Sequence, residues 1–126
     1  MNQETKRQPI PSVTRKIVYG KYHGHCAYCG CEIEYRQMQV DHKKPLRLGG
    51  GNDIDNLLPA CRSCNHYKST LTVEKYRAYL SGIYARLMRD SIPFQVGIRF
   101  GIFEHRTDKI VFYFEKYGEL DKNEHC

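Results

Sequence analysis

No run of apolar residues in this 126-residue chain is long enough to span a lipid bilayer. The segment from Met1 to Gln8 is polar and lacks the apolar core of a signal peptide. The sequence also contains neither an internal repeat nor a low-complexity segment. These absences disfavour membrane-spanning, secreted and repeat proteins, so we expect a cytoplasmic protein with no membrane partner.

Tryptophan is also absent, whereas tyrosine occurs ten times with a spacing more typical of a core than of a base-stacking surface. The length suits one domain with a modest core. The net charge of +6 at pH 7 is compatible with a polyanionic partner such as nucleic acid. Some charges of this size reflect solubility alone, so charge by itself does not establish such a partner.

The first half of the chain is expected to combine one short helix with two strands. Residues 1–10 are polar and are expected to form a flexible arm. A helix is expected to begin at Ser12 as its N-cap, with Val13 and Ile17 on one apolar stripe. The apolar segments that follow predict two strands, at residues 33–40 and 56–60.

The second half of the chain is expected to be mainly helical. A longer helix is predicted from Val73 to about Arg89, with Thr72 as its N-cap. Residues 94–103 alternate like a strand but also fit helical spacing, so both alternatives stay open at this point. Residues 110–114 are rich in β-formers and are predicted to be a strand.

The most informative feature of the sequence is its two Cys-x-x-Cys pairs, Cys26/Cys29 and Cys61/Cys64. In a reducing compartment, such pairs are more often zinc ligands or redox dithiols than disulfides. A redox role needs only one dithiol of low pKa, and the regular double pairing disfavours a set of buried free thiols. Zinc takes four thiolates in a tetrahedral arrangement, so we predict a structural zinc held by all four cysteines.

Two further cysteines lack this spacing. Cys31 follows Cys29 by two residues, and Cys126 is the last residue of the sequence. We therefore expect Cys31 to be a spare thiol and Cys126 to lie in a disordered end.

Asp41 and His42 lie next to each other between the two cysteine pairs. In an extended segment, neighbouring side chains point to opposite faces, so a carboxylate and an imidazole can flank one scissile phosphate. An imidazole is suited to accept a proton from water near neutral pH. Mg²⁺ prefers carboxylate and amide oxygens, which Asp41 and Asn65 could supply. These residues are therefore candidates for a hydrolytic site.

Asn56 follows His42 across a glycine-rich loop. Its amide could hydrogen-bond the loop or the backbone and so fix the orientation of the imidazole. Each candidate has an ordinary explanation when taken alone, because an Asp-His pair is usually structural, Asn56 could cap a turn and Asn65 could cap a helix. Their arrangement within a four-cysteine frame favours the catalytic interpretation.

With these motifs the sequence resembles the HNH nuclease family in its four-cysteine, zinc-stabilised form. The resemblance rests on the order and spacing of five runs, at residues 26–29, 40–45, 49–50, 55–58 and 61–68. It implies an α+β fold with a small ββα-metal (His-Me finger) core and a structural zinc bound by four cysteines, flanked by helices and a C-terminal helical and strand extension. We accordingly divide a single domain, 1–126, into an arm at 1–10, a nuclease core at 11–70 and a helical and β extension at 71–126.

The resemblance also implies roles for the site residues. It identifies His42 as the general base, Asp41 as a ligand of one divalent cation, and Asn56 as the residue that orients the base. Asn65 matches the final metal ligand, with His66 as the runner-up, because adjacent side chains on a helix diverge by about 100° and cannot both face one cation. The implied cation is Mg²⁺ or Mn²⁺, with other divalent transition metals as alternatives.

Double-stranded DNA is the expected partner. Basic residues near the site are candidate phosphate contacts, although each could instead belong to a solvated surface: Lys43, Lys44, Arg47, Arg62 and Lys68. Residues 72–126 bear a looser likeness to small phage and prophage HNH proteins. That likeness implies a bacterial or phage-infected host cell, with phage packaging or other DNA-processing proteins as further partners.

The sequence therefore predicts a divalent-metal-dependent DNA endonuclease that nicks DNA or cuts both strands. The alternative is a non-catalytic zinc-knuckle module for DNA binding or for phage assembly and packaging. Such a module would have no chemical reason to carry Asp41, His42 and Asn65 together. Plasmid cleavage by the wild type and by His42→Ala distinguishes the two functions.

Overall fold

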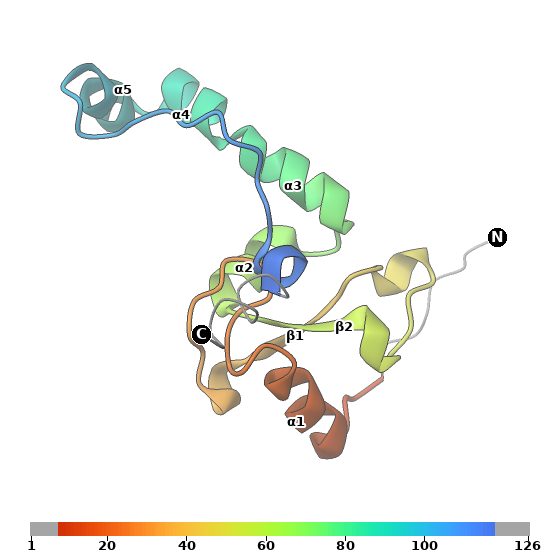
Figure 1. Ribbon diagram of the computed structural model, residues 1–126. Helices are drawn as coiled ribbons and strands as arrows, with labels where there is room; N and C mark the ends of the chain where they lie inside the picture. Colours follow the sequence, from red (N-terminus) through yellow and green to blue (C-terminus); the bar gives the residue numbers. More distant parts are fainter. Residues whose placement is uncertain (1–7, 118–126) are drawn as a thin grey trace. The chain divides into compact units, whose positions relative to one another are not determined.

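The computed structural model describes residues 8–117 (Figure 1). The described residues form two compact units, one made of residues 8–73 with 111–117 and the other of Glu74–Ile110. The first unit contains all of the predicted core and also takes in a segment of the predicted extension. No helix within residues 8–117 combines the length and the apolar character needed to cross a membrane.

The first unit is built on a two-stranded antiparallel sheet of β1, Gln39–His42, and β2, Leu57–Ala60. The register places Asp41 opposite Leu58. All four residues of β2 are buried, so this strand anchors β1 to the interior of the unit. The core cluster consists of Val18, Met38 and Leu57, with Ile10, Tyr19, Ile33, Val40 and Ile54 packed against it.

The first strand is shorter than predicted. Residues 33–40 do not form one strand, because the 3₁₀ turn η1, Tyr35–Gln37, precedes β1. The Arg15 guanidinium donates to the carbonyl oxygens of Tyr35 at 3.0 Å and Met38 at 3.1 Å. These carbonyls are satisfied by a side chain, and β2 is too short to pair with more than the four residues of β1.

Helix α1, Ser12–Gly20, packs against β2 and begins where the sequence predicts. Its N-cap is Pro11, and no side chain caps it, so the predicted capping role of Ser12 is wrong. Val18 is the buried residue of this helix, whereas Val13 and Ile17 are 70% and 49% exposed. The predicted apolar stripe therefore does not face the core.

The chain between the two strands is a loop that contains two 3₁₀ turns, η2 at Leu46–Leu48 and η3 at Ile54–Asn56. Helix α2, Arg62–Lys68, follows β2 after a single residue, Cys61. The sulfur of Cys61 caps α2 by accepting a hydrogen bond from the Cys64 amide at 3.4 Å. The two strands and α2 thus form a ββα core.

The second unit is helical. The long helix predicted from Val73 is broken at Gly82 into α3, Val73–Ser81, and α4, Ile83–Asp90. Of residues 94–103, those up to Arg99 are helical, because α5 spans Ile92–Arg99, and residues 100–103 form a turn. Ser91 caps α5 by accepting a hydrogen bond from the Phe94 amide at 3.2 Å, and a proline lies in the first turn, where its missing N–H costs nothing.

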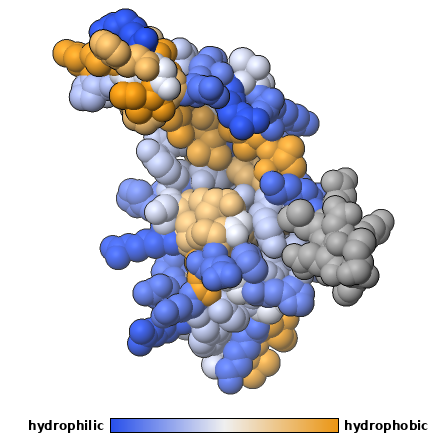
Figure 2. Space-filling model, turned by 60° about the vertical axis from the view of Figure 1, so that its left-hand side comes forward, coloured by the Kyte–Doolittle hydropathy of each residue, from blue (hydrophilic) through white to orange (hydrophobic). Residues whose placement is uncertain are grey.

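Large apolar side chains gather at the α5 end of the second unit, which is the orange surface at the top of Figure 2. Ile92, Phe100 and Ile102 are each at least 70% exposed.

The predicted strand at residues 110–114 is wrong. The backbone amides of Tyr113 and Phe114 donate to the carbonyls of Tyr28 and Ala27 at 3.0 and 2.7 Å, and residues 113–117 are helical. The amides thus pair with the loop around the first cysteine pair and not with a strand. The α+β fold class with its small ββα core is confirmed.

Candidate metal centre and catalytic site

The four paired cysteines converge on one point in the first unit. Cys26 and Cys29 lie in the turn that follows α1, while Cys61 caps α2 and Cys64 lies in its first turn. Their four sulfur atoms all lie within 4.8 Å of one another, and the Cys29 and Cys61 sulfurs are 3.8 Å apart. A tetrahedral zinc with bonds of about 2.3 Å separates its sulfurs by about 3.8 Å. The cluster therefore fits a single metal ion of this kind.

The local chemistry also suits a cation. A hydrogen bond from the Cys64 side chain lowers the pKa of the Cys26 thiol to about 4, although burial acts in the opposite direction. This hydrogen bond favours the thiolate form of Cys26, which is the form that binds a metal. Cys31 is exposed and does not belong to the four-sulfur group, as the sequence predicts, and Cys126 lies outside the described residues.

Asp41 is buried beside α2. Its Oδ2 accepts a hydrogen bond from the Tyr28 hydroxyl, and its Oδ1 forms an ion pair of 3.0 Å with the Lys68 ammonium. Lys68 is itself fully buried and donates a second hydrogen bond to the His42 carbonyl at 2.8 Å. Burial raises the pKa of the Asp41 carboxyl above its ordinary value, while the Lys68 charge and the Tyr28 hydroxyl lower it.

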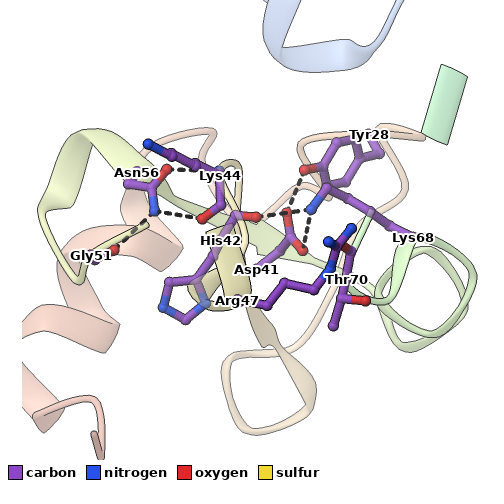
Figure 3. Close-up of polar contacts among 9 residues, drawn as sticks. All are labelled: Tyr28, Asp41, His42, Lys44, Arg47, Gly51, Asn56, Lys68 and Thr70. Carbon is purple, nitrogen blue, oxygen red and sulfur yellow. Dashed lines mark hydrogen bonds and ion pairs between the residues drawn. The ribbon is translucent and has the colours of Figure 1, made fainter. Parts of the chain in front are cut away.

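His42 is half-buried and faces away from this buried carboxylate. Figure 3 shows its ring and the Asp41 carboxylate on different sides of β1, as alternation along a strand requires. Its Nε2 lies 2.7 Å from Oδ1 of Asn52, a residue of the loop between the strands. No other hydrogen bond engages the ring within residues 8–117.

Asn56 holds the loop, and its side chain makes no hydrogen bond to the imidazole of His42. Its Oδ1 accepts from the Lys44 amide at 2.9 Å, and its Nδ2 donates to the carbonyls of Lys44 at 3.1 Å and Gly51 at 2.9 Å (Figure 3). The structure therefore contains the expected hydrogen bonds of Asn56 to the loop backbone. The side chain that meets the imidazole is Asn52.

Asn65 and His66 lie on different faces of α2. Asn65 precedes Lys68 by three residues, so the two side chains share the helix face that meets β1. Asn65 is half-buried, and its side-chain amide forms no hydrogen bond within the described part of the chain, whereas His66 is exposed. This placement favours Asn65 over His66 as a partner for Asp41.

The basic residues predicted to contact DNA are not equivalent. Lys44, Arg47 and Arg62 are exposed, and Arg47 also donates from Nε to the Thr70 carbonyl at 3.0 Å. Lys43 is half-buried, with its ammonium 6.0 Å from the centroid of the Phe114 ring. Lys68 is 0% exposed and bound to Asp41, so it cannot reach a phosphate in this arrangement.

Sequence reasoning missed two residues of the site. Tyr28 lies inside the first Cys-x-x-Cys pair, and the regularity of that pair draws attention to the sulfurs alone. Asn52 stands in the glycine-rich loop, where a polar residue usually indicates a turn. The sequence did contain one indication of this contact. The loop must end beside the point where it began, because β1 and β2 are paired, and residues late in the loop, such as Asn52, can therefore lie near His42.

Known proteins share this core. Residues 26–70 match the model of the HNH endonuclease family. The chain is 36% identical over 79 residues to YoqL, a protein of the SPbeta prophage in Bacillus subtilis strain 168 whose name assigns it to the HNH endonucleases; the match covers 56% of this chain and 34% of YoqL. Among solved structures, the Type II-C Cas9 enzyme from Actinomyces naeslundii matches with a TM-score of 0.51 and 28% identity, over 60% of this chain and 9% of that one.

The fold and the site define a four-cysteine ββα domain. Residues 26–70 belong to the HNH endonuclease family, which confirms the family predicted from the sequence. The matched segment begins at the first metal-site cysteine and ends two residues after Lys68, so it holds both cysteine pairs, both strands and α2. The chain spans about a third of the length of YoqL and less than a tenth of the Cas9 chain.

Proposed function

We propose that the chain is a divalent-metal-dependent endonuclease that hydrolyses phosphodiester bonds in double-stranded DNA, by nicking or by cutting both strands. The observation that carries the proposal is the setting of β1, where Asp41 is buried beside α2 and His42 presents a half-buried imidazole engaged at one nitrogen. The HNH domain at residues 26–70 supports the nuclease class.

His42 is the proposed general base. Asn52 engages Nε2, so Nδ1 is the nitrogen available to accept a proton from water. The hydroxide so formed attacks phosphorus in line, and the bond from phosphorus to the 3′-oxygen breaks. Asn56 supports this arrangement indirectly, because it holds the loop that carries Asn52.

Asp41 and Asn65 are the proposed ligands of one Mg²⁺ or Mn²⁺ ion, and other divalent transition metals are alternatives. A carboxylate offers about four lone-pair positions, and the contacts from Tyr28 and Lys68 take two of them. The side-chain amide of Asn65, which forms no hydrogen bond within residues 8–117, adds an oxygen donor of the kind that hard cations prefer. When bound, the cation supplies positive charge that stabilises the leaving oxygen.

A structural Zn²⁺ is the proposed occupant of the four-sulfur cluster. Its proposed role is to tie the turn after α1 to the start of α2, which carries Asn65 and Lys68. Metal binding at such sites contributes directly to folding, so we expect the ββα core to depend on it. None of the four cysteines is a reacting group in the proposed mechanism.

Lys44, Arg47 and Arg62 are the proposed contacts to the DNA backbone, because each is exposed near the site or on α2. Phosphate contacts position a protein on DNA without reading its sequence, so weakly specific binding is expected. The prophage origin of YoqL supports a phage setting, in which packaging or other DNA-processing proteins are further partners.

The proposal is tested by cleavage of supercoiled plasmid with the zinc-loaded protein in Mg²⁺ or Mn²⁺. The wild type is expected to produce nicked or linear DNA, and His42→Ala is expected to lower the rate by about 10²- to 10⁴-fold, as for loss of a general base. His105→Ala, in the second unit, is the matched control and should keep the wild-type rate. Undiminished cleavage by His42→Ala would refute the mechanism, and a wild type inactive with every cation would favour the non-catalytic module.

A further inference from the structure

Asn52 makes the single side-chain hydrogen bond to the imidazole ring of His42 within the described residues. It lies on the far side of the loop between β1 and β2, and its Oδ1 is 2.7 Å from Nε2 of His42. That distance is typical of a well-formed hydrogen bond. The other ring nitrogen, Nδ1, forms no hydrogen bond within the described residues.

The chemistry of the pair fixes which nitrogen carries the proton. A neutral imidazole has one N–H donor and one acceptor nitrogen, and a carbonyl oxygen can only accept. With Oδ1 against Nε2, the hydrogen must lie on Nε2, and Nδ1 keeps its lone pair. We propose that Asn52 is a positioning residue for His42, which holds the imidazole in the Nε2–H tautomer and fixes the direction of the Nδ1 lone pair.

The loop that carries Asn52 is itself held at several points. Asn56 donates to the carbonyl of Gly51, the residue before Asn52, and makes two hydrogen bonds to the backbone of Lys44 near the start of the loop. Gly50 packs so closely that an added Cβ would lie 1.8 Å from the Lys44 carbonyl oxygen. The loop therefore returns to β1 along a tight path, and Asn52 reaches His42 from a restrained backbone.

Asn56 and Asn52 therefore have different roles in this loop. Asn56 acts on the loop backbone, and Asn52 transmits that restraint to the ring, so the orientation attributed to Asn56 from the sequence is reached through a second side chain. The catalytic part of the inference rests on the proposed function, because it requires His42 to be the base. The hydrogen bond and the tautomer do not depend on catalysis.

The first experiment measures the tautomer without DNA. Full-length, zinc-loaded, ¹⁵N-labelled protein is studied by long-range ¹H–¹⁵N correlation at a pH where the imidazole is neutral, with His42→Ala used to assign the signals. The wild type is expected to show one tautomer, Nε2–H, with a ring proton that exchanges slowly. Asn52→Asp keeps an acceptor and should keep both features. Asn52→Ala should lose the slow proton and move the ¹⁵N shifts towards those of a freely interconverting ring.

Asp53→Ala is the matched control, because this exposed neighbour lies in the same loop and forms no hydrogen bond to the ring. It should reproduce the wild-type spectrum. An Nδ1–H tautomer in the wild type, or an unchanged spectrum in Asn52→Ala, would overturn the inference. A general loss of structure in Asn52→Ala would instead alter signals across the whole protein, and Asn52→Asp would then decide the outcome by retaining or losing the Nε2–H signal.

The second experiment measures plasmid cleavage by the same variants. Asn52→Ala is expected to lower kcat by about 10- to 100-fold with little change in KM for DNA, because ring placement is lost while the DNA contacts remain. Asn52→Asp should recover most of that loss. If the wild type shows the Nε2–H tautomer but cuts no DNA, the proposed function fails and the contact stands. If the wild type cuts DNA and Asn52→Ala cuts it equally well, the positioning role fails and the nuclease stands.

Discussion

At the scale of single residues, Lys68 departs furthest from what its place in the sequence suggests. A lysine at this place in the sequence is expected to contact a DNA phosphate. The side chain of Lys68 is instead fully buried, and its ammonium donates hydrogen bonds to the Asp41 carboxylate and the His42 carbonyl. Burial raises the pKa of the Asp41 carboxyl, and the charge of Lys68 is the largest influence that opposes this shift. Lys68 therefore favours the charged form of a buried carboxyl beside the proposed base.

Lys68→Met is expected to destabilise the protein by about 3–5 kcal/mol, because it leaves the buried Asp41 carboxylate without its partner. Chemical denaturation of the zinc-loaded protein measures this loss. Lys16→Met, on the exposed side of α1, is the matched control and should change the free energy of unfolding by about 0.5 kcal/mol or less. Adding Asp41→Asn to Lys68→Met should restore part of the loss, because the unpaired charge is gone.

The same variant has a pH dependence whose sign follows from Asp41. A carboxyl whose pKa is raised on folding adds most to stability when protonated, and that contribution is lost as pH rises through the folded pKa. Without Lys68 the pKa of Asp41 rises further. The difference in stability between variant and wild type should therefore shrink as pH falls, and a difference that grew on acidification would contradict this account.

At the scale of elements, α2 gathers the functions of the site. This seven-residue helix begins beside one metal-site cysteine, carries another in its first turn, and then presents Asn65 and Lys68 towards β1. A seven-residue helix is too short to be stable by itself in water. Its position depends on the sulfur cluster at one end and on the ion pair with Asp41 at the other.

Cys29→Ser is expected to lose the bound zinc and most of the folded ββα core, because structural zinc contributes about 10 kcal/mol or more to the folding of small domains. Cys31→Ser is the matched control, since it changes an exposed thiol two residues away that is not part of the cluster. It should retain one zinc per chain and a wild-type melting temperature. Metal content by mass spectrometry and thermal unfolding measure both effects, and zinc loss in Cys31→Ser would contradict a four-cysteine site.

The elements also mark where sequence reasoning succeeded and where it could not. The spacing of the cysteines was enough to predict the four-sulfur cluster, because two short turns bring the sulfurs together whatever the rest of the fold. The prediction of a strand at residues 33–40 was wrong because the Arg15 side chain donates to the Tyr35 and Met38 carbonyls, which in a strand would accept hydrogen bonds from a neighbouring strand. Asn52 and Lys68 were not predicted in their roles because each depends on a contact with a distant residue, which no local periodicity encodes.

At the scale of the whole molecule, the chain leaves the first unit after Val73 and returns to it at Val111. The returning segment pairs with the first cysteine turn through the backbone of Tyr28 and Ala27. Phe112 is 2% exposed, and its ring meets that of Tyr28 edge-on at 5.0 Å. The residue that donates to Asp41 is thus packed against a segment from the far end of the sequence.

Phe112→Ala is expected to destabilise the first unit by about 3–5 kcal/mol, as for truncation of a buried aromatic side chain. The matched control is Phe100→Ala, since Phe100 is 78% exposed and its truncation should cost about 0.5 kcal/mol or less. Denaturant unfolding of the full chain measures both. An equal effect from the two variants would show that the returning segment adds nothing to the first unit.

The buried ammonium of Lys68 affects how the protein would respond to the supply of metal ions in a cell. The carboxylate proposed to hold Mg²⁺ already has a permanent positive neighbour supplied by the chain, so it is not left bare when the divalent ion is scarce. In the proposed function, the fold depends on a soft, thiolate-bound ion, while the chemistry depends on a hard, oxygen-bound one. A shortage of magnesium would leave a folded and idle protein, and a shortage of zinc would leave none to be activated.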